Sequence, residues 1–318
     1  MSSPSKFVAI LNPDYEPVVE REMFAKAGYQ LIVAQCSTDE ETIAAVSEAE
    51  GIIDIYCKIT DFVARNIPKC KVIVRAGVGY DMIDVKACRA NGIQVCNVPD
   101  YCTEEVSDHA VALMMMLQRK LMQHFQFVQA KKWDGMLVGE VRRLNALTLG
   151  VIGFGAIGRR FAVKMKEIVP NIIAFDPYLD DGYFQKIGVK RVGVEDALLN
   201  SDLISLHCPL TPENYHIISN DILNRMTRKP IIINTSRGGL IDQEALIKAL
   251  EEGLISAAGL DVVENEPNVP QKFLTMNNVI ITPHTAWYST DADLEDRTRS
   301  VEDVLRVMHG EKPRNPVF

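Results

Sequence analysis

LTLGVIGFGAIGRRFAVKMKEIVPNIIAFD, residues 147–176, is the stretch that decides the fold. It opens with a short apolar run, long enough for a buried strand and too short for a helix. A glycine-rich turn, residues 153–158, follows at once, and an amphipathic helical segment comes next. A second apolar run, residues 172–175, ends at Asp176. The order strand, glycine turn, helix, strand, acid is typical of a dinucleotide-binding βαβ unit.

Each glycine of the turn has a physical role. Gly153 allows the tight turn, Gly155 allows a pyrophosphate to approach the backbone, and Gly158 allows the helix to pack on the strand. The helix N-terminus, with Ala156 and Ile157, offers unpaired N–H groups and a positive dipole end to the phosphates. We therefore expect these five residues to bind a dinucleotide; the alternative is a turn of this shape that has lost its ligand.

The acid at the end of the second run indicates which dinucleotide binds. Asp176 lies about 20 residues beyond Gly158, the distance expected for the carboxylate that accepts the ribose hydroxyls of NAD. The next residues are Pro177 and Tyr178, so no arginine follows to compensate a 2′-phosphate. This favours NAD over NADP.

Composition excludes several classes of protein. The 318 residues are 47% hydrophobic and 24% charged, as in an average globular protein. The formal charge of −8 argues against general binding of nucleic acid or anionic membranes. No stretch has the ~18 uninterrupted apolar residues of a membrane helix, and no secretory signal is visible. The seven cysteines show no metal-ligand spacing, so we expect reduced thiols, no metal and a cytoplasmic protein.

Short apolar runs alternate with helical segments over the first hundred residues. The runs are FVAIL, LIVAQC, GIIDIY, KVIVRAG and IQVCNV, and the last ends near Pro99. Strands that alternate with helices indicate βαβ units and a parallel sheet covered on both faces. The alternation continues beyond the glycine turn, with strands expected over 203–207, 231–236, 257–262 and 279–283, and helices over 220–226, 243–252 and 292–309.

Residues 103–130 predict one long helix between the two blocks. Thr103 is a cap candidate, and the first turn is acidic, which suits the helix dipole. The apolar residues cover more than one face, so we expect burial on several sides. A domain-spanning helix, a subunit interface and an ordinary core helix all fit this pattern.

Three strand ends carry residues suited to chemistry. Arg237 follows one predicted strand, Glu266 follows the next, and His284 follows the third. Singly, each has an ordinary structural interpretation. Because ligands bind outside the carboxyl ends of parallel strands, a cation, a carboxylate and an imidazole on one sheet edge beside a dinucleotide turn predict a reaction centre.

The chain resembles the NAD-dependent D-2-hydroxyacid dehydrogenase family over nearly its whole length. Within that family it is similar to the phosphoglycerate dehydrogenases and to the C-terminal binding protein branch. The motifs that carry the resemblance are the glycine turn, RAGVGYD at 75–81, NTSRGG at 234–239, LDV with Glu266-Pro267 at 260–267, and PHTAW at 283–287.

The resemblance implies an architecture of two doubly wound parallel-sheet α/β domains. A Rossmann NAD-binding domain, residues 102–290, is inserted in a flavodoxin-like substrate domain made of residues 1–101 and 291–318. The long helix from Thr103 would mediate a homodimer.

The resemblance also implies the roles of the strand-end residues. Arg237 holds the carboxylate and carbonyl oxygens of a 2-oxo acid, as a planar, always charged donor can. His284 is the general acid in reduction and the base in oxidation, and Glu266 fixes its tautomer and favours the imidazolium. By the same resemblance, the NAD site includes Asp261, Cys208, Pro209, Thr235 and Val106.

The substrate side is predicted less fully. The backbone N–H groups of Val78 and Gly79, next to Arg75, are implied to hold the substrate carboxylate. Lys58 is a candidate for an anionic substrate tail, or an exposed loop lysine. Trp287 walls off a side chain or packs a hinge. Against the 2-oxo acid dehydrogenase stand two alternatives: an NAD(H)-sensing protein like the corepressors of the C-terminal binding protein branch, and a D-3-phosphoglycerate dehydrogenase.

Overall fold

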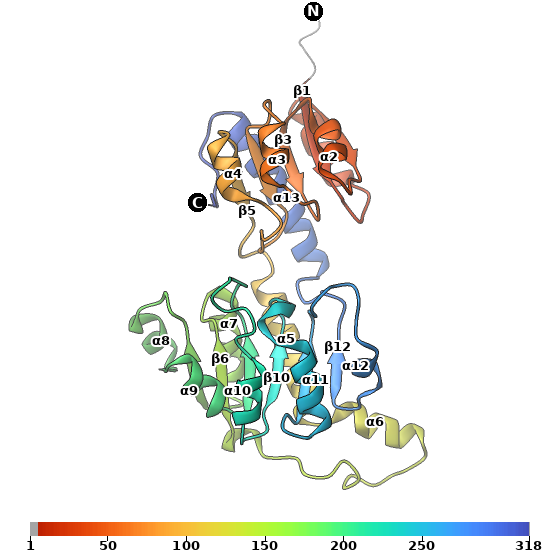
Figure 1. Cartoon of the computed structure of the whole chain (residues 1–318), viewed down its shortest axis with the longest axis vertical. Coiled ribbons are helices and arrows are strands. Elements are labelled where there is room, and N and C mark those ends of the chain that lie inside the picture. The colour runs from red at the N-terminus through yellow and green to blue at the C-terminus, as the bar shows by residue number, and fades with distance from the viewer. Residues whose placement is uncertain (1–5, 318) are drawn as a thin grey trace, which may run out of the picture. The chain divides into compact units, whose positions relative to one another are not determined.

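The computed structural model describes residues 6–317, which divide into two compact units (Figure 1). The central unit runs from Thr103 to Tyr288. The terminal unit joins the residues before Thr103 to those after Tyr288. Each unit is described by itself below. Both are doubly wound parallel α/β structures, which confirms the predicted fold class.

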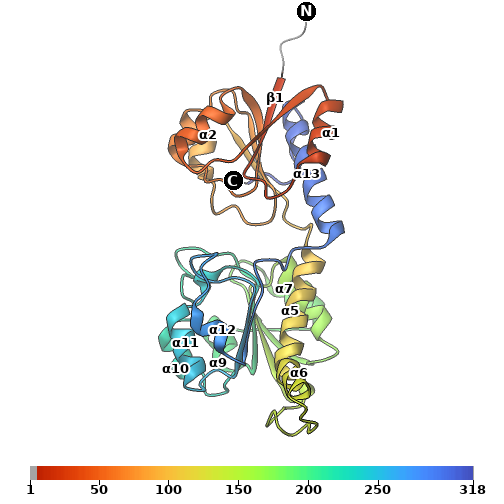
Figure 2. The same ribbon diagram turned by 90° about the vertical axis from the view of Figure 1, so that its right-hand side faces the viewer.

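The terminal unit is built on a five-stranded parallel sheet in the order β2-β1-β3-β4-β5, the flavodoxin-like order. Its strands are β1 (Lys6–Leu11), β2 (Tyr29–Ala34), β3 (Ala49–Asp54), β4 (Val72–Arg75) and β5 (Gln94–Asn97). One face is covered by α1 (Val18–Lys26) and α13 (Thr290–Met308), as Figure 2 shows. The other face is covered by α2 (Asp39–Val46), α3 (Asp61–Arg65) and α4 (Val85–Ala90).

The apolar strands of this unit follow from burial on both faces. Val8, Ile10, Ile53 and Val74 pack toward α1 and α13, where Val304 is also buried. Alternate residues of the same strands pack toward α2, α3 and α4. A strand covered on both faces has no solvent side, so a nearly continuous apolar run is what the fold requires.

The central unit has a seven-stranded parallel sheet in the order β12-β11-β10-β9-β6-β7-β8. This is the Rossmann order with one further strand, and the strand order reverses between β6 and β9. The strands are β6 (Thr148–Ile152), β7 (Asn171–Phe175), β8 (Lys190–Arg191), β9 (Leu203–Leu206), β10 (Ile231–Asn234), β11 (Ala257–Leu260) and β12 (Val279–Ile281).

Helices cover both faces of this sheet. On one face lie α5 (Thr103–Gln118), α7 (Ala156–Met165) and α8 (Asp181–Ile187). On the other lie α9 (Val194–Leu199), α10 (Asn220–Arg225), α11 (Gln243–Glu251) and α12 (Gln271–Thr275). Two single 3₁₀ turns, Leu144–Ala146 and Gly238–Leu240, complete the unit. The short elements α8, β8, α9 and α12 were not predicted.

The prediction of one helix over residues 103–130 is wrong. The helix ends at Gln118, and a separate helix, α6 (Leu121–Gln129), follows. The break is at Lys120, which has a left-handed φ of 51° and donates from Nζ to the Val138 carbonyl at 2.6 Å. Thr103 is not a cap either, because its Oγ1 has no hydrogen-bond partner among residues 6–317. The acidic first turn instead pairs with α7 through Glu104 and Lys164.

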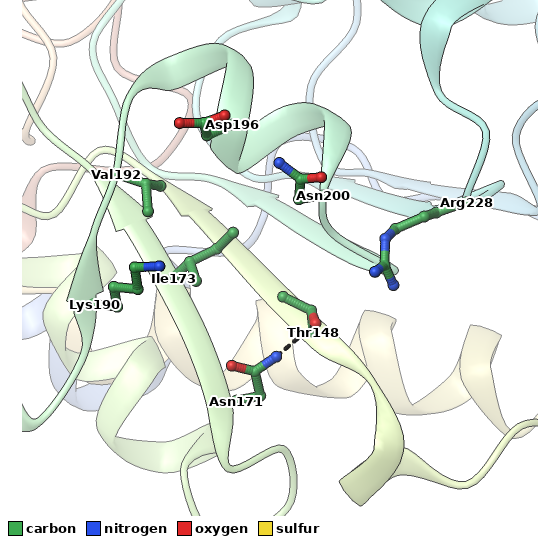
Figure 3. Close-up of a pocket in the computed structure, with 8 residues that line it drawn as sticks. All are labelled: Thr148, Asn171, Ile173, Lys190, Val192, Asp196, Asn200 and Arg228. Carbon is green, nitrogen blue, oxygen red and sulfur yellow. Dashed lines mark hydrogen bonds between the residues drawn. The ribbon is translucent and has the colours of Figure 1, made fainter.

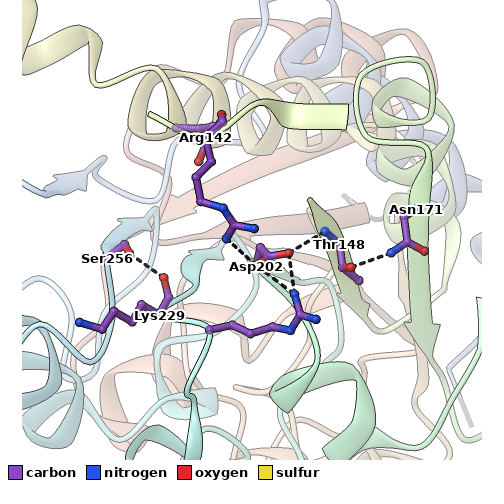
Figure 4. Close-up of polar contacts among 8 residues, drawn as sticks. Arg142, Thr148, Asn171, Asp202, Lys229 and Ser256 are labelled. Atoms are coloured by element: carbon purple, nitrogen blue, oxygen red, sulfur yellow. Dashed lines mark hydrogen bonds and ion pairs between the residues drawn. The ribbon is translucent and has the colours of Figure 1, made fainter. Parts of the chain in front are cut away.

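The amino-terminal edge of the central sheet holds an open pocket of about 380 Å³ (Figure 3). Thr148 and Asn171 lie on its rim, and their side chains share a hydrogen bond of 2.6 Å. Asp202 lies buried nearby and pairs with Arg142, which Figure 4 labels, and with Arg228. This edge is opposite the one that carries the glycine turn, so the pocket is not part of the predicted reaction centre.

Candidate active site

The glycine turn connects β6 to α7 and has the geometry of a phosphate cradle. Gly153 has a left-handed φ of 88°, and a Cβ there would lie 2.6 Å from the His207 carbonyl. A Cβ on Gly158 would collide with the Gly153 carbonyl. Only Gly155 faces open space, with nothing within 4 Å of a Cβ position. The first and third glycines thus serve packing, and the second leaves room for a pyrophosphate at the start of α7, beside Ala156 and Ile157.

Asp176 lies at the end of β7, beside this turn, and is buried. Its Oδ2 accepts from the Phe154 N–H at 2.9 Å, and its Oδ1 accepts from the Tyr178 N–H at 2.9 Å. The carboxylate is therefore fixed beside the glycine turn, and its contact with the ribose of NAD stays a prediction. The expectation that no cation lies near it is wrong, since Arg191 on β8 donates to the Asp176 carbonyl at 3.2 Å.

The other residues predicted to line the cofactor are spread over three strand ends and a helix. Val106 is buried on α5. Cys208 and Pro209 follow β9, and burial raises the pKa of the Cys208 thiol to about 11. Thr235 follows β10, and its buried Oγ1 has no partner in the described residues. That orphaned hydroxyl on the cofactor edge of the sheet fits a site that takes a polar ligand.

Asp261, predicted to receive the nicotinamide amide, accepts three hydrogen bonds within the protein. Oδ1 accepts from the Thr282 hydroxyl at 2.6 Å and the Thr285 N–H at 2.9 Å, and Oδ2 accepts from the Ala286 N–H at 2.9 Å. The residue is 2% exposed. In this arrangement its carboxylate fixes the loop on both sides of His284, and its contact with a cofactor stays a prediction.

His284 occupies an unusual backbone conformation at the centre of that loop. Its φ is 53°, a left-handed value that costs a non-glycine residue about 1–2 kcal/mol. Two hydrogen bonds to the backbone groups of His284 compensate this cost. The His284 N–H donates to the Asp261 carbonyl at 2.8 Å, and the Trp287 indole donates to the His284 carbonyl at 3.1 Å. The loop is thus held in one conformation by Asp261 and its neighbours.

The His284 ring is paired with Glu266. Nδ1 and Oε2 are 2.8 Å apart, and both side chains are partly exposed. Burial raises the pKa of Glu266, but the hydrogen bond and charge of His284, together with the Val263 N–H and Arg237, lower it below its ordinary value. Glu266 is therefore ionised at neutral pH and accepts from Nδ1, which leaves Nε2 for another partner.

Arg237 lies on the same sheet edge, at the end of β10. Its backbone carbonyl accepts from the Asn234 side chain at 2.8 Å, and its Nη1 donates to the Ser236 carbonyl at 2.8 Å. The charge of Arg237 acts on Glu266. The structure thus brings Arg237, Glu266 and His284 together at three neighbouring strand ends, as the sequence predicted.

The residues predicted to bind substrate, apart from Arg237 and Trp287, belong to the terminal unit. Arg75 ends β4, and the loop after it is fixed by hydrogen bonds from Asn97 to the Val78 carbonyl at 2.7 Å and from the Val98 N–H to the Gly77 carbonyl at 3.0 Å. The N–H groups of Val78 and Gly79 donate no hydrogen bond to any residue of 6–317. They remain open to an anion.

Lys58 and Trp287 were each predicted to have one of two roles. Lys58 is exposed between the buried Cys57 and Ile59, and its ammonium has no ion pair within the described residues. Trp287 is half-buried and meets the Tyr288 ring edge-on, with centroids 5.5 Å apart. Both roles remain predictions.

Two histidines outside the sequence motifs have polar partners in the structure. His109 on α5 lies 2.9 Å from the Thr282 hydroxyl and 3.8 Å from Asp261. His216 pairs with Glu264 at 2.6 Å. Long-range contacts of this kind leave no local signal in the sequence. His109 therefore belongs to the network that holds the His284 loop.

From the sequence we expect no membrane-spanning helix, no metal site and no disulfide. No helix within 6–317 is both long and apolar enough to cross a bilayer. In the same range, no group of three or more His, Cys, Asp or Glu side chains is arranged to hold a metal. All seven cysteines are unpaired, and six are buried.

A Rossmann sheet, an open cradle at the glycine turn and an acid–imidazole pair on the same edge define a dinucleotide-binding protein of the dehydrogenase class. Residues 111–286 match the family model described as D-isomer specific 2-hydroxyacid dehydrogenase, NAD binding domain. The chain belongs to the D-isomer specific 2-hydroxyacid dehydrogenase family.

Three comparisons illustrate this membership. The chain is 38% identical to the D-3-phosphoglycerate dehydrogenase of Methanocaldococcus jannaschii over 90% of its own length and 55% of the relative, so it spans about half of that protein. It is 36% identical to the glyoxylate reductase of Korarchaeum cryptofilum, over 86% and 84% of the two chains. The structure of Aquifex aeolicus D-lactate dehydrogenase with NAD and lactic acid superposes with a TM-score of 0.86, at 29% identity over 96% of each chain.

Proposed function

We propose that this chain catalyses the NAD(H)-dependent interconversion of a 2-oxo acid and its D-2-hydroxy acid. The observation that carries the proposal is the 2.8 Å pair between His284 Nδ1 and Glu266 Oε2, on the sheet edge that also holds the glycine turn. An imidazole held this way donates or accepts a proton through Nε2.

The residues divide the work of the reaction as follows. Arg237 binds the substrate carboxylate and carbonyl oxygen through its planar guanidinium. When NADH is bound, it supplies the hydride that the ketone carbon accepts. His284 donates a proton from Nε2 to the carbonyl oxygen as the alcohol forms, and in the reverse direction it accepts that proton. Glu266 holds Nδ1–H and stabilises the imidazolium.

The two units would divide the ligands between them. The central unit would bind NAD, with the glycine turn at the pyrophosphate and Asp176 at the ribose. The terminal unit, predicted as residues 1–101 and 291–318, would bind the substrate carboxylate with Arg75 and the open N–H groups of Val78 and Gly79.

The test is a substrate panel with NADH and NADPH in parallel. Glyoxylate, pyruvate and 3-phosphohydroxypyruvate represent the activities that the similar proteins are named for. We expect NADH oxidation with at least one of them, and a fall in kcat of ~10²–10⁴-fold in His284→Ala, the usual value of a positioned acid. Binding of NADH to the variant, followed by fluorescence, should be unchanged.

Two outcomes contradict the proposal. Turnover that survives in His284→Ala removes the role of the imidazole. Tight NADH binding without turnover of any 2-oxo acid favours the NAD(H)-sensing alternative.

We also propose a homodimer in the cytoplasm that buries the apolar face of α6. Leu121, Phe125 and Val128 lie at helical spacing on one face, and no residue of this helix is buried. Trp133, in the segment that follows, is 90% exposed. A second copy would cover this surface.

Light scattering after size-exclusion chromatography tests the dimer. Phe125→Glu should yield a monomer, whereas Val163→Glu, at an exposed apolar position on α7, should remain dimeric. A wild-type monomer at micromolar concentration contradicts the proposal.

A further inference from the structure

The terminal unit contains a set of buried polar groups that its own hydrogen bonds do not satisfy. Asp54 Oδ2, Arg75 Nε and Asp296 Oδ1 are buried, and none has a hydrogen-bond partner among residues 6–317. Orphaned atoms of this kind are rare in folded proteins and call for an explanation. Here the three atoms belong to two carboxyl groups and one guanidinium, which carry opposite charges when ionised.

The fold places this set around the predicted substrate loop. Asp54 and Arg75 are cross-strand neighbours at the carboxyl ends of β3 and β4. Asp296 is buried on α13, which packs against the same two strands. The Arg75 guanidinium occupies the space that a Cβ on Gly77 would fill, and Gly77 has a φ of 129°. The guanidinium therefore lies against the backbone of the loop that leads to Val78 and Gly79.

Neither carboxyl is neutralised by direct contact. Asp54 accepts one hydrogen bond, from the Cys57 N–H at 2.9 Å. Arg75 forms no ion pair within 4.0 Å with any described residue. Burial raises the pKa of Asp54 to about 7, with the Cys57 N–H and the Arg75 charge opposing it. Burial likewise raises the pKa of Asp296 to about 7, and Arg75 is the first charge that opposes it.

The same unit contains an ion pair that is complete. Arg297 donates to both oxygens of the buried Glu20 at 2.9 Å. Two parallel bonds of this kind satisfy a buried carboxylate and fix a guanidinium in one position. Arg75 lacks such a partner, so its guanidinium remains available to a ligand.

We propose that Asp54 and Asp296 are positioning residues that control, through their protonation, how strongly Arg75 binds an anionic substrate. With both carboxyls ionised, the three side chains carry a net charge of −1, which weakens the attraction of Arg75 for an anion. With both protonated, the set carries +1 and that attraction is strongest. The inference rests on the proposed function only in taking the Arg75 loop as a substrate site.

Neighbouring ionisable groups modify this effect without replacing it. Burial raises the pKa of the Tyr101 hydroxyl and of the Cys57 thiol, so both are neutral between pH 6 and 8.5. The charged groups that act on Asp296 besides Arg75 are Glu20 on α1, and Asp293 and Arg299 on α13. Arg299 is paired with Asp100 and Glu295, and Arg297 with Asp293 and Glu20.

The experiment measures binding of oxamate, a 2-oxo acid analogue that is not reduced, to the NADH-loaded protein from pH 6 to 8.5. We expect the wild-type Kd to rise about tenfold over this range, a change equivalent to one pKa unit of coupling. Asp54→Asn and Asp296→Asn should each flatten the profile, and the double variant should bind at pH 8.5 as tightly as the wild type at pH 6. Glu48→Gln, which breaks a surface pair with Lys69, is the matched control and should keep the wild-type profile.

Two further measurements separate this effect from other sources of pH dependence. The difference between the wild-type and variant profiles isolates the two carboxyls, and it should persist in a His284→Gln background. Calorimetry in buffers of different ionisation enthalpy counts protons taken up when oxamate binds at pH 7.5. The double variant should take up fewer protons than the wild type.

The outcomes distinguish the inference from the proposed function. If the variants bind oxamate with the wild-type pH dependence and proton uptake, the inference is wrong and the proposed function stands. If the wild type binds no oxamate at any pH and reduces no 2-oxo acid, the proposed function itself fails. Should the double variant not fold, the two single variants carry the same test.

Discussion

Two regions of the molecule bury carboxylates in opposite ways. In the central unit, Asp202 accepts from Arg142 at 2.7 Å, Arg228 at 3.1 Å and the Thr148 N–H at 2.8 Å (Figure 4). Burial raises its pKa, but these donors outweigh burial and hold the pKa below the ordinary value. In the terminal unit, Asp54 has a single N–H donor, and burial has the larger effect, so its pKa is raised.

The difference teaches that direct donors can keep a buried carboxyl charged, whereas burial with few donors favours its neutral form. A carboxylate surrounded by donors holds elements together: Asp202 connects the segment before β6, the start of β6 and the loop before β10. A carboxyl that has few hydrogen-bond donors and a pKa near neutrality changes its charge when the pH of the solution changes. The first type lies at the sheet edge away from the predicted chemistry, and the second lies beside the predicted substrate loop.

The largest effect on stability is expected at Asp202, the buried carboxylate that has several hydrogen-bond donors. Asp202→Ala leaves two guanidiniums without their shared partner, and breaking such a pair costs about 3–5 kcal/mol when the remaining charges are buried. Because Arg142 and Arg228 are each nearly half exposed, we expect about 2–3 kcal/mol, measured by urea unfolding. Asp196→Ala, an exposed neighbour at the pocket, is the control and should change stability by less than about 0.5 kcal/mol.

The second prediction concerns the pH dependence of stability. A folded pKa above the unfolded value means that stability is complete below the unfolded pKa and is lost as pH rises through the folded pKa. Asp54 and Asp296, both near 7, should therefore make the wild type less stable as pH rises from about 4 to 7, by up to about 1.4 kcal/mol per pH unit for each carboxyl, and the curve should level off at higher pH. Asp54→Asn should flatten the curve, and an unchanged slope would show that Asp54 does not titrate there.

Asp261 offers a third prediction, because it is saturated like Asp202 but lies at the reactive edge. Asp261→Asn replaces an oxygen that accepts a hydrogen bond with a group that donates one, and should cost about 1–2 kcal/mol of stability. It should also lower kcat about tenfold at unchanged NADH affinity, since the His284 loop loses its support. A loss of NADH binding without loss of kcat would instead support the predicted contact with the nicotinamide.

The smallest effect is expected at Lys58, which has neither a pair nor burial. If it contacts an anionic substrate tail, Lys58→Ala should raise KM for 3-phosphohydroxypyruvate by about 3–5-fold, the size of an exposed charge contact. The KM for pyruvate should be unchanged. Equal changes with both substrates would assign Lys58 to the loop surface.

Much of the fold was predictable because the decisive signals are local. Glycines at 153, 155 and 158 between two apolar runs specify a turn that few other structures use. Arg237, Glu266 and His284 could be grouped because parallel strands deliver their carboxyl ends to one edge.

The remainder depended on contacts between distant segments. No sequence pattern around Lys120 predicts its left-handed conformation, because the hydrogen bond that stabilises it reaches the distant Val138 carbonyl. Arg191 approaches Asp176 through the pairing of β7 with β8, and β8 has only two residues. Asp54 and Asp296 both interact electrostatically with Arg75 because the last helix packs on the first sheet, although they lie nearly 250 residues apart in the chain.

The central claim is that Glu266 and His284 act together as the proton donor for a 2-oxo acid. The most direct measurement is kcat/KM for reduction as a function of pH in the wild type and in Glu266→Gln, with NADH affinity checked in both. We predict that kcat/KM drops at least tenfold in Glu266→Gln, because His284 has lost the carboxylate that holds Nδ1–H. Identical profiles and plateaus in the two proteins would contradict the account.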